Sequence, residues 1–126
     1  MPKRTVATDD APAAVGAYSQ AAVAGGFVYT AGQVPLKPDG EQVTGSVEEQ
    51  TRQALDNVEA VLSEAGASLE DVVKVTVYLD DIDDFGEMNA AYGDYFTDEP
   101  PARSAVAVED VPLGAAVEIE AVAHVG

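Results

Sequence analysis

The chain has 126 residues with 23 acidic and 6 basic side chains, so its net charge at pH 7 is −17. It contains no cysteine, which excludes disulfides, zinc–thiolate sites and cysteine nucleophiles. The length and the 47% hydrophobic content predict one folded domain, residues 1–126, and the acidic charge argues against nucleic acid as a partner because no basic stripe exists to displace counterions.

The first elements predicted are the strands of a β-hairpin. A polar lead-in, with an edge strand at 4–7, precedes two apolar runs at 18–24 and 27–32. Gly25 and Gly26 separate these runs, and a glycine pair between apolar segments is typical of the tight turns that join antiparallel strands.

A long amphipathic helix follows the hairpin. Ser46 and Glu49 have the spacing of a capping box, and Gly66 is a suitable residue just beyond the end of the helix. Apolar residues recur between these signals at helical spacing and predict a buried stripe. The stripe consists of Val47, Ala54, Val58, Val61, Leu62 and Ala65.

The second half of the chain predicts a strand, a helix and two more strands. The strand at 71–79 presents an apolar face formed by Val73, Val75, Val77 and Leu79.

Asp81 is suited to cap the helix that comes next. Its buried stripe contains Phe85, Met88, Tyr92, Tyr95 and Phe96, which we interpret as core packing. Asn89 lies on or beside this buried face. Pro100 and Pro101 end the helix and lead into the strand that contains Arg103, and the last strand covers 116–124.

Charged side chains interrupt both of the last two strands. The two-residue period of a strand places Arg103 on a face with Ala105, and Glu118 on a face with Glu120 and Val122. Charged groups on core strands cost free energy unless they are paired, hydrogen-bonded or in contact with a ligand. We therefore predict that Arg103 and Glu118 serve a ligand. The local pattern leaves open a hairpin of these two strands, with Arg103 roughly opposite Glu120.

The element order predicts an α/β fold. Strands separated by single helices favour parallel βαβ units, with both helices on the same side of one mixed sheet. The opposite face of the sheet is then uncovered, although its residues are too apolar for water. We therefore expect other copies of the chain to cover it in a small ring, with ligand sites at the subunit seams.

Several motifs resemble the Rid (YjgF) family, and most closely its RidA subgroup. They follow one another along nearly the whole chain: GAYSQA (16–21), YTAGQVP (29–35), QTRQALDNVEAVLSEAG (50–66), DVVKVTVYLDDIDDF (71–85), MNAAYGDYF (88–96), PARSAV (101–106) and VEIEAVA (117–123). The resemblance implies a chorismate-mutase-like (YjgF-like) fold and a homotrimer with its sites between subunits.

The same resemblance implies an activity and a site. RidA members hydrolyse 2-imino acids to 2-keto acids and ammonia without a metal or cofactor, and the matching positions are Tyr18, Gly32, Asn89, Arg103 and Glu118. Arg103 offers a planar fork for the substrate carboxylate, and Glu118 is the candidate that positions the water or takes its proton. In the family, Tyr18 closes the pocket, Asn89 supports it, and the backbone at Gly32 approaches the ligand.

The chain departs from the family pattern at two positions. Ala105 follows PARS where the family often has cysteine, and Ala31 stands where serine is frequent. Because imine hydrolysis requires no nucleophilic thiol, we expect activity to survive. Glu120 is interpreted as structural, Lys74 as a surface or interface residue, and His124 as non-catalytic.

Other functions are kept as alternatives. A non-catalytic protein that binds a small carboxylate or keto acid would use Arg103 in the same way. An endoribonuclease or translation inhibitor, an activity also attached to this family, conflicts with the net charge of −17. Chorismate mutase chemistry requires several cationic contacts to a dianion, and only one is visible.

The composition also carries expectations about location. No apolar run has the length of a membrane span and the N-terminus lacks the apolar core of a secretion signal, so we expect a cytoplasmic protein without a membrane partner. The surplus of like charge repels itself in dilute buffer but is screened at about 1 M salt, where the Debye length falls to roughly 3 Å. We therefore predict a protein from a salt-loving cell.

Overall fold

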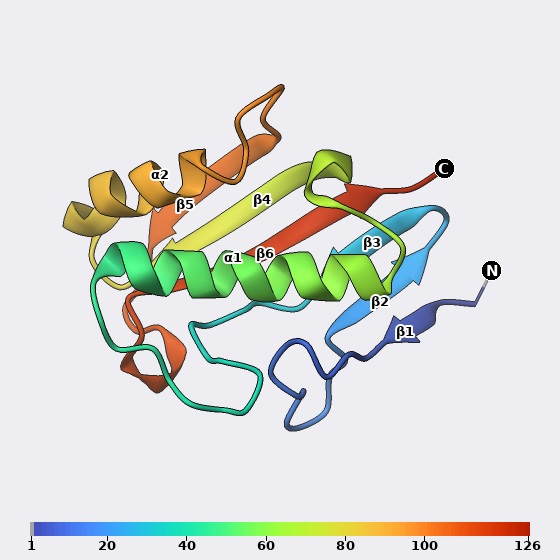
Figure 1. The fold of residues 1–126 in the computed structure, drawn as a ribbon, viewed down its shortest axis with the longest axis horizontal. Helices are drawn as coiled ribbons and strands as arrows, with labels where there is room; N and C mark the ends of the chain where they lie inside the picture. The colour runs from blue at the N-terminus through green and yellow to red at the C-terminus, as the bar shows by residue number, and fades with distance from the viewer. Residues whose placement is uncertain (1) are drawn as a thin grey trace.

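The computed structural model describes residues 2–126 as an α/β fold on one mixed sheet (Figure 1). The strands are β1 (Arg4–Val6), β2 (Ala21–Ala24), β3 (Phe27–Thr30), β4 (Val72–Leu79), β5 (Ala102–Ala107) and β6 (Val117–His124). Their order in the sheet is β1-β2-β3-β6-β4-β5, in which only β4 and β5 are parallel neighbours. The helices are α1 (Val47–Glu64) and α2 (Phe85–Gly93), and 3₁₀ turns occur at Leu69–Asp71, Ile82–Asp84 and Pro112–Gly114.

Both helices lie on the same face of the sheet, as the sequence predicted. In Figure 1, α1 crosses in front of β6 and α2 runs beside α1. The connection from β4 through α2 to the parallel strand β5 is the expected βαβ unit. Because β6 pairs with β4 and not with β5, the alternative hairpin of the last two strands is wrong.

The predicted signals for α1 are confirmed. The hydroxyl of Ser46 accepts a hydrogen bond from the backbone N–H of Glu49 at 3.1 Å, which satisfies one of the free donors at the start of the helix. The apolar stripe is fully buried against the sheet at Ala54, Leu55, Val58, Val61 and Leu62. Burial of each large aliphatic side chain stabilises the fold by about 1.5–3 kcal/mol, so this stripe fixes α1 on the sheet.

The predicted apolar face of β4 is wrong at one residue. Val75, Val77 and Leu79 are buried, but Val73 is 46% exposed. The pairing with β6 is irregular between Val72 and Lys74, which reverses the alternation and places Val72 in the core instead. A shift of one residue in a strand exchanges the two faces, and sequence alternation alone does not reveal it.

The second helix is shorter than predicted. It ends at Gly93, so Tyr95 and Phe96 lie beyond it, and Asp81 caps the 3₁₀ turn at Ile82–Asp84 through its contact with the N–H of Asp83. The strands of the first hairpin are also shorter, because Tyr18 and Gly32 lie outside β2 and β3.

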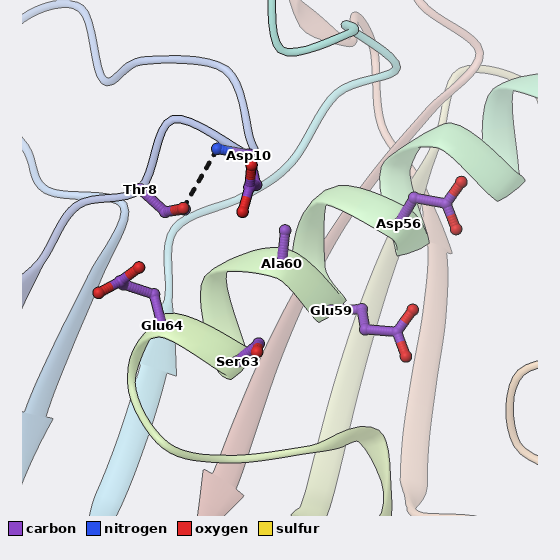
Figure 2. A pocket seen from close by; sticks show the side chains of 7 residues that line it. All are labelled: Thr8, Asp10, Asp56, Glu59, Ala60, Ser63 and Glu64. Atoms are coloured by element: carbon purple, nitrogen blue, oxygen red, sulfur yellow. Dashed lines mark hydrogen bonds between the residues drawn. The ribbon is translucent and has the colours of Figure 1, made fainter.

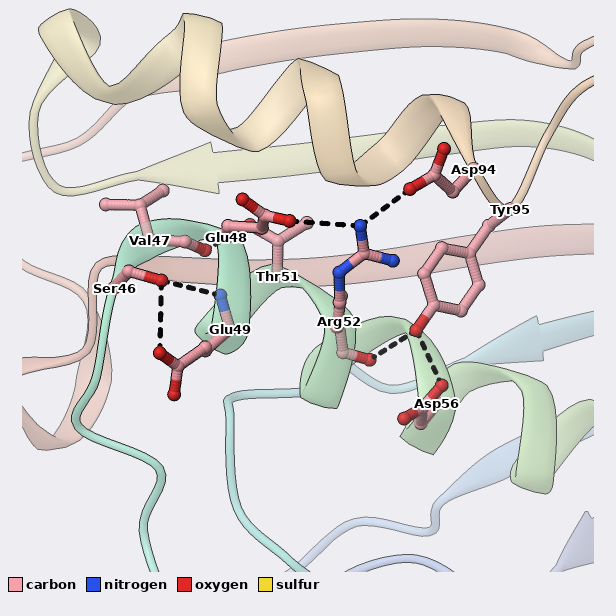
Figure 3. Close-up of polar contacts among 9 residues, drawn as sticks. All are labelled: Ser46, Val47, Glu48, Glu49, Thr51, Arg52, Asp56, Asp94 and Tyr95. Carbon is pink, nitrogen blue, oxygen red and sulfur yellow. Dashed lines mark hydrogen bonds and ion pairs between the residues drawn. The ribbon is translucent and has the colours of Figure 1, made fainter.

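A polar network joins the C-terminal end of α2 to α1 (Figure 3). The guanidinium of Arg52 on α1 contacts the carboxylates of Glu48 at 3.1 Å and Asp94 at 2.6 Å. The hydroxyl of Tyr95 donates to Asp56 at 2.7 Å and also lies 3.2 Å from the backbone carbonyl of Arg52, which shares the same hydrogen. This network holds α2, which carries Asn89, against the longer helix.

The face of the sheet away from the helices carries mixed side chains and no layer of the described chain covers it (Figure 1). The register places Glu118 beside Tyr78, Glu120 beside Thr76 and Val122 beside Tyr29 on this face. Tyr29 is 49% exposed there. We call this surface the open face. Neither α1 nor α2 combines the length and apolar character needed to span a membrane.

Candidate functional site

Arg103 is held by α2 on the helix-covered side of the sheet. It sits on β5 in register with the buried Val75, so both side chains point toward the helical layer. One guanidinium nitrogen, Nη1, donates to the side-chain oxygen of Asn89 at 2.7 Å. The guanidinium carbon lies 4.7 Å from the ring centre of Tyr92 and 5.3 Å from that of Phe85. An amide and two aromatic faces therefore orient the fork of Arg103.

None of these contacts neutralises the charge of Arg103. The ion pairs found within residues 2–126 join Lys37 to Glu41 and Arg52 to both Glu48 and Asp94, and none includes Arg103. Arg103 thus keeps a full positive charge and N–H donors beyond the bond to Asn89, which suits it to bind a carboxylate in two-point geometry.

Glu118 lies with Gly32 on the opposite, open face. Glu118 is half-buried, and burial raises the pKa of its carboxyl group, with a further rise from the neighbouring charge of Glu120. A methyl group at Gly32 would collide with Oε2 of Glu118 and would lie 2.8 Å from its Cδ. A side chain at position 32 would therefore displace the carboxylate of Glu118 from the place that it occupies here.

Two carboxylates, those of Glu118 and Glu120, lie close together on the open face. Tyr78 is its partner in register on β4, and burial together with the charges of Glu120 and Glu118 raises the pKa of the Tyr78 hydroxyl. Lys74, further along the same strand, donates from Nζ to the hydroxyl of Ser104 at 2.9 Å.

One chain does not bring the predicted site residues together. Val75 is in register with Arg103 on one side and with Ala121 on the other, whereas Tyr78 is in register with Glu118. Residues three apart on a strand point to opposite faces, so Arg103 and Glu118 lie on opposite faces of the sheet with β4 between their strands. The predicted residues form two groups, Arg103 with Asn89 and Glu118 with Gly32.

Tyr18 belongs to neither group within one chain. It lies in the lead-in before β2, its side chain is 54% exposed, and its hydroxyl accepts a hydrogen bond from the N–H of Val15 at 3.4 Å. The position of its ring is therefore set by the backbone that carries it.

Sequence reasoning missed part of the surroundings of Arg103. Phe85 and Tyr92 belong to the core packing, as predicted, and both rings also contact the guanidinium, which was not predicted. A usable signal was present, because positions 85, 89 and 92 fall on one side of a helix and Asn89 was already a candidate. Ala105, in the place of the frequent family cysteine, is half-buried on the same side of β5 as Arg103.

The hollow drawn in Figure 2 does not suit an anionic ligand. It lies between the lead-in and α1 and is lined by Thr8, Asp10, Asp56, Glu59, Ala60, Ser63 and Glu64. Four of these residues carry carboxylates and none is basic, so the lining repels a carboxylate. Arg103, with its oriented guanidinium and no ion pair in the described structure, is better suited to attract such a group.

Comparison with known proteins places these features in a family. Residues 8–125 match the family described as Endoribonuclease L-PSP, also known as the YjgF or Rid family. The chain belongs to this family.

Individual relatives match over nearly their whole length. A RutC family protein of Pyrococcus abyssi is 49% identical over 98% of each chain. The 2-iminobutanoate/2-iminopropanoate deaminase of Escherichia coli is 43% identical over 95% of this chain and 96% of its own. The crystal structure of E. coli TdcF with bound serine is 36% identical, covers 98% of this chain and 99% of its own, and gives a TM-score of 0.93. These matches confirm the predicted Rid family and its α/β fold with two helices.

Proposed function

We propose that this Rid family protein is a hydrolytic deaminase that converts small 2-imino acids, and the enamines that interconvert with them, into 2-keto acids and ammonia. The observation that carries the proposal is Arg103: a guanidinium fixed by Asn89, Tyr92 and Phe85, yet paired with no carboxylate of the described chain. A relative with 43% identity bears the name of this activity.

The reaction needs only water and proton transfer. The carboxylate of the imino acid binds Arg103, a water oxygen bonds to the imine carbon, and the C=N double bond becomes single. Glu118 takes a proton from this water and passes it to the nitrogen; the second proton of the water, released from the hydroxyl as the carbonyl forms, also goes to the nitrogen, and the C–N bond breaks as ammonia leaves. The hydroxyl on carbon loses its proton and becomes the keto oxygen. General acid–base assistance of this type contributes about 10²–10⁴-fold to a rate.

The raised pKa of Glu118 fits the role of proton acceptor. A carboxylate with an ordinary pKa is a weak base near neutral pH, whereas partial burial and the charge of Glu120 make Glu118 more basic. The lack of a side chain at Gly32 lets the carboxylate of Glu118 lie directly against the backbone at this position.

A complete site requires two copies of the chain, because Arg103 and Glu118 lie on opposite faces of one sheet. We infer a homotrimer in which the open face is buried between subunits and Arg103 of one copy meets Glu118 of the next. The exposed aromatic residues Phe27 and Tyr29 and the apolar Val106 on this face support burial against a partner.

An assay with imine produced in place tests the function. An amino-acid oxidase generates 2-iminopropanoate, and release of pyruvate and ammonia is timed with and without the protein. We expect the protein to accelerate release in proportion to its concentration. If release is unchanged while calorimetry detects 2-oxobutanoate binding, the protein is a binding module, as the serine-bound relative allows. Sedimentation of the wild-type protein tests the homotrimer.

A further inference from the structure

The segment between β1 and β2 is ordered around one buried side chain, Gln20. Residues 7–19 contain no helix or strand, and Gln20 is the last residue before β2. Its side chain is only 4% exposed. Its Oε1 accepts the backbone N–H of Thr8 at 2.6 Å, and its Nε2 faces the carbonyls of Thr8 at 3.1 Å, Pro12 at 2.8 Å and Ala11 at 3.5 Å.

These contacts replace the backbone pairing that the segment lacks. A primary amide has one acceptor and two donors, and Gln20 uses both functions on the backbone. The side chain of Gln20 bonds to both the N–H and the C=O of Thr8, as a residue of a paired strand would. Its contact with the carbonyl of Pro12 holds the returning chain near the start of β2. A buried amide without such partners would be costly, so the side chain and the segment fix each other.

Gln20 also connects this segment to the Glu118 half of the site. Its backbone carbonyl accepts the N–H of Ala31 at 2.8 Å, and Ala31 precedes Gly32. Tyr18 lies two residues before Gln20 and has just one long hydrogen bond of its own. One residue therefore links the backbone that carries Tyr18 to the backbone beside Gly32 and Glu118.

We propose that Gln20 is a positioning residue for the deaminase site: it fixes residues 8–19, and with them Tyr18, relative to the backbone at Ala31 and Gly32. This inference rests on the proposed function. It differs from a plain stabilising role, because a released segment must be reordered each time a ligand binds. Substitution of Gln20 should therefore weaken substrate binding and raise KM, and it should leave kcat nearly unchanged.

Two substitutions separate these roles. Gln20→Glu keeps the shape and the acceptor but replaces the Nε2 donor by an oxygen that faces the carbonyls of Thr8 and Pro12. Gln20→Met keeps the volume and removes all the bonds. Gln42→Glu is the matched control, because it makes the same chemical change where Nε2 has one bond, to the carbonyl of Leu113 at 3.0 Å.

Steady-state kinetics with 2-iminopropanoate provide the first measurement. We expect Gln20→Glu to raise KM about tenfold and Gln20→Met, which removes all the bonds, to raise it at least as much, with kcat within about twofold and Gln42→Glu unchanged. In a Tyr18→Ala background the same substitutions should add less than about twofold, because residues that act through one another are not additive. An unchanged KM, full additivity with Tyr18→Ala, or failure of both variants to fold would overturn the proposal.

Hydrogen exchange keeps the inference testable if the deaminase proposal fails. Should the wild-type protein leave imine hydrolysis unaccelerated, the function is wrong, and the exchange of backbone amides then decides whether Gln20 fixes the segment. We expect Gln20→Glu to speed exchange at residues 8–19 while α1 and β6 stay protected. Exchange at 8–19 that matches the wild type would refute the role of Gln20.

Discussion

Arg52 and Arg103 both contact residues in α2 or just beyond its end. Arg52 is paired with carboxylates, whereas Arg103 contacts an amide and two aromatic rings. Arg52 lies on α1 with its side chain 38% exposed and forms ion pairs with Glu48 and Asp94 (Figure 3). Arg103 lies on β5 and is held by a neutral amide, from Asn89, and by two aromatic rings. Within the portion that the structure describes, no carboxylate forms an ion pair with it.

The difference in ion pairing suggests different roles for the two arginines. In a chain with 23 acidic residues, carboxylate partners are abundant, and Arg52 has two. Its neutralised charge ties two helices together. Amide and aromatic contacts orient Arg103 without cancelling its charge, because each offers only a partial negative charge. The free charge supports our proposal that Arg103 binds an anionic ligand.

Arg103→Ala should have the largest effect on activity. We expect kcat/KM for 2-iminopropanoate to fall about 10²–10³-fold, since losing a charge-assisted contact to a bound carboxylate costs about 3–4 kcal/mol. The assembly state should be unchanged in sedimentation, because in the proposed mechanism the guanidinium contacts substrate and is not needed to join subunits. Arg103→Lys should be intermediate, since an ammonium keeps the charge but not the planar fork.

Arg52→Ala is the matched control for this loss. It removes a guanidinium of the same size from the other side of α2, where its ion pairs are exposed to solvent. We expect kcat/KM to stay within about threefold of wild type, because exposed pairs contribute little. Equal losses in the two variants would mean that Arg103 also acts by holding α2, and the assignment of its charge to a ligand would be wrong.

Glu118→Gln tests the proposed proton acceptor on the open face. We expect kcat to fall about 10²-fold, the lower end of general-base assistance, while binding of 2-oxobutanoate by calorimetry is largely retained. A loss confined to binding would remove Glu118 from the role of proton acceptor.

The pKa of Glu118 adds a stability test with a defined sign. Its folded-state pKa is raised by burial and by Glu120, so the folded chain holds this proton to higher pH than the unfolded chain does. Wild-type stability therefore falls as pH rises from the unfolded pKa through the folded one. Glutamine does not titrate. The Glu118→Gln variant should match the wild type in urea unfolding below this window and be more stable than it at neutral pH, and the reverse order would contradict the raised pKa.

The architecture was predictable from the sequence because its signals are local. The cap at Ser46 and the 3.6-residue stripe that follows specify α1 without reference to any other element. The two-residue alternation specifies β6, where Glu118 and Glu120 alternate with buried Val117 and Ile119.

The arrangement of the site was less predictable because it depends on pairings between distant strands. Nothing within β5 or β6 says that β4 lies between them, and this pairing puts Arg103 and Glu118 on opposite faces. Gln20 was also missed, since a glutamine beside an apolar run is normally a solvated residue; only the folded lead-in supplies its backbone partners.

Salt tests the contribution of the ion pairs that Arg52 forms at the surface. Raising KCl from 0.1 M to 1 M shortens the Debye length from about 10 Å to about 3 Å and screens both the ion pairs of Arg52 and the repulsion among the acidic side chains. We expect the Tm of the wild type to rise, because the net charge of −17 outweighs three exposed ion pairs. The small Tm deficit of Arg52→Ala at low salt should vanish at 1 M KCl. A wild-type Tm that stays level or falls would refute the predicted adaptation to salt.

Two tyrosines near these arginines provide the smallest and most discriminating prediction. Tyr95, in the Arg52 network, has two hydrogen-bond partners for its hydroxyl, whereas the hydroxyl of Tyr92, beside Arg103, is the one buried side-chain polar atom without a partner in the described structure. Tyr95→Phe should destabilise the fold by about 0.5–1.5 kcal/mol. Tyr92→Phe should be neutral or stabilising in urea unfolding, because it removes a buried group that gains no bond and keeps the ring against Arg103. If Tyr92→Phe instead costs as much as Tyr95→Phe, its hydroxyl has a partner supplied by water or another copy of the chain, and Arg103 is held by more than the contacts of a single subunit.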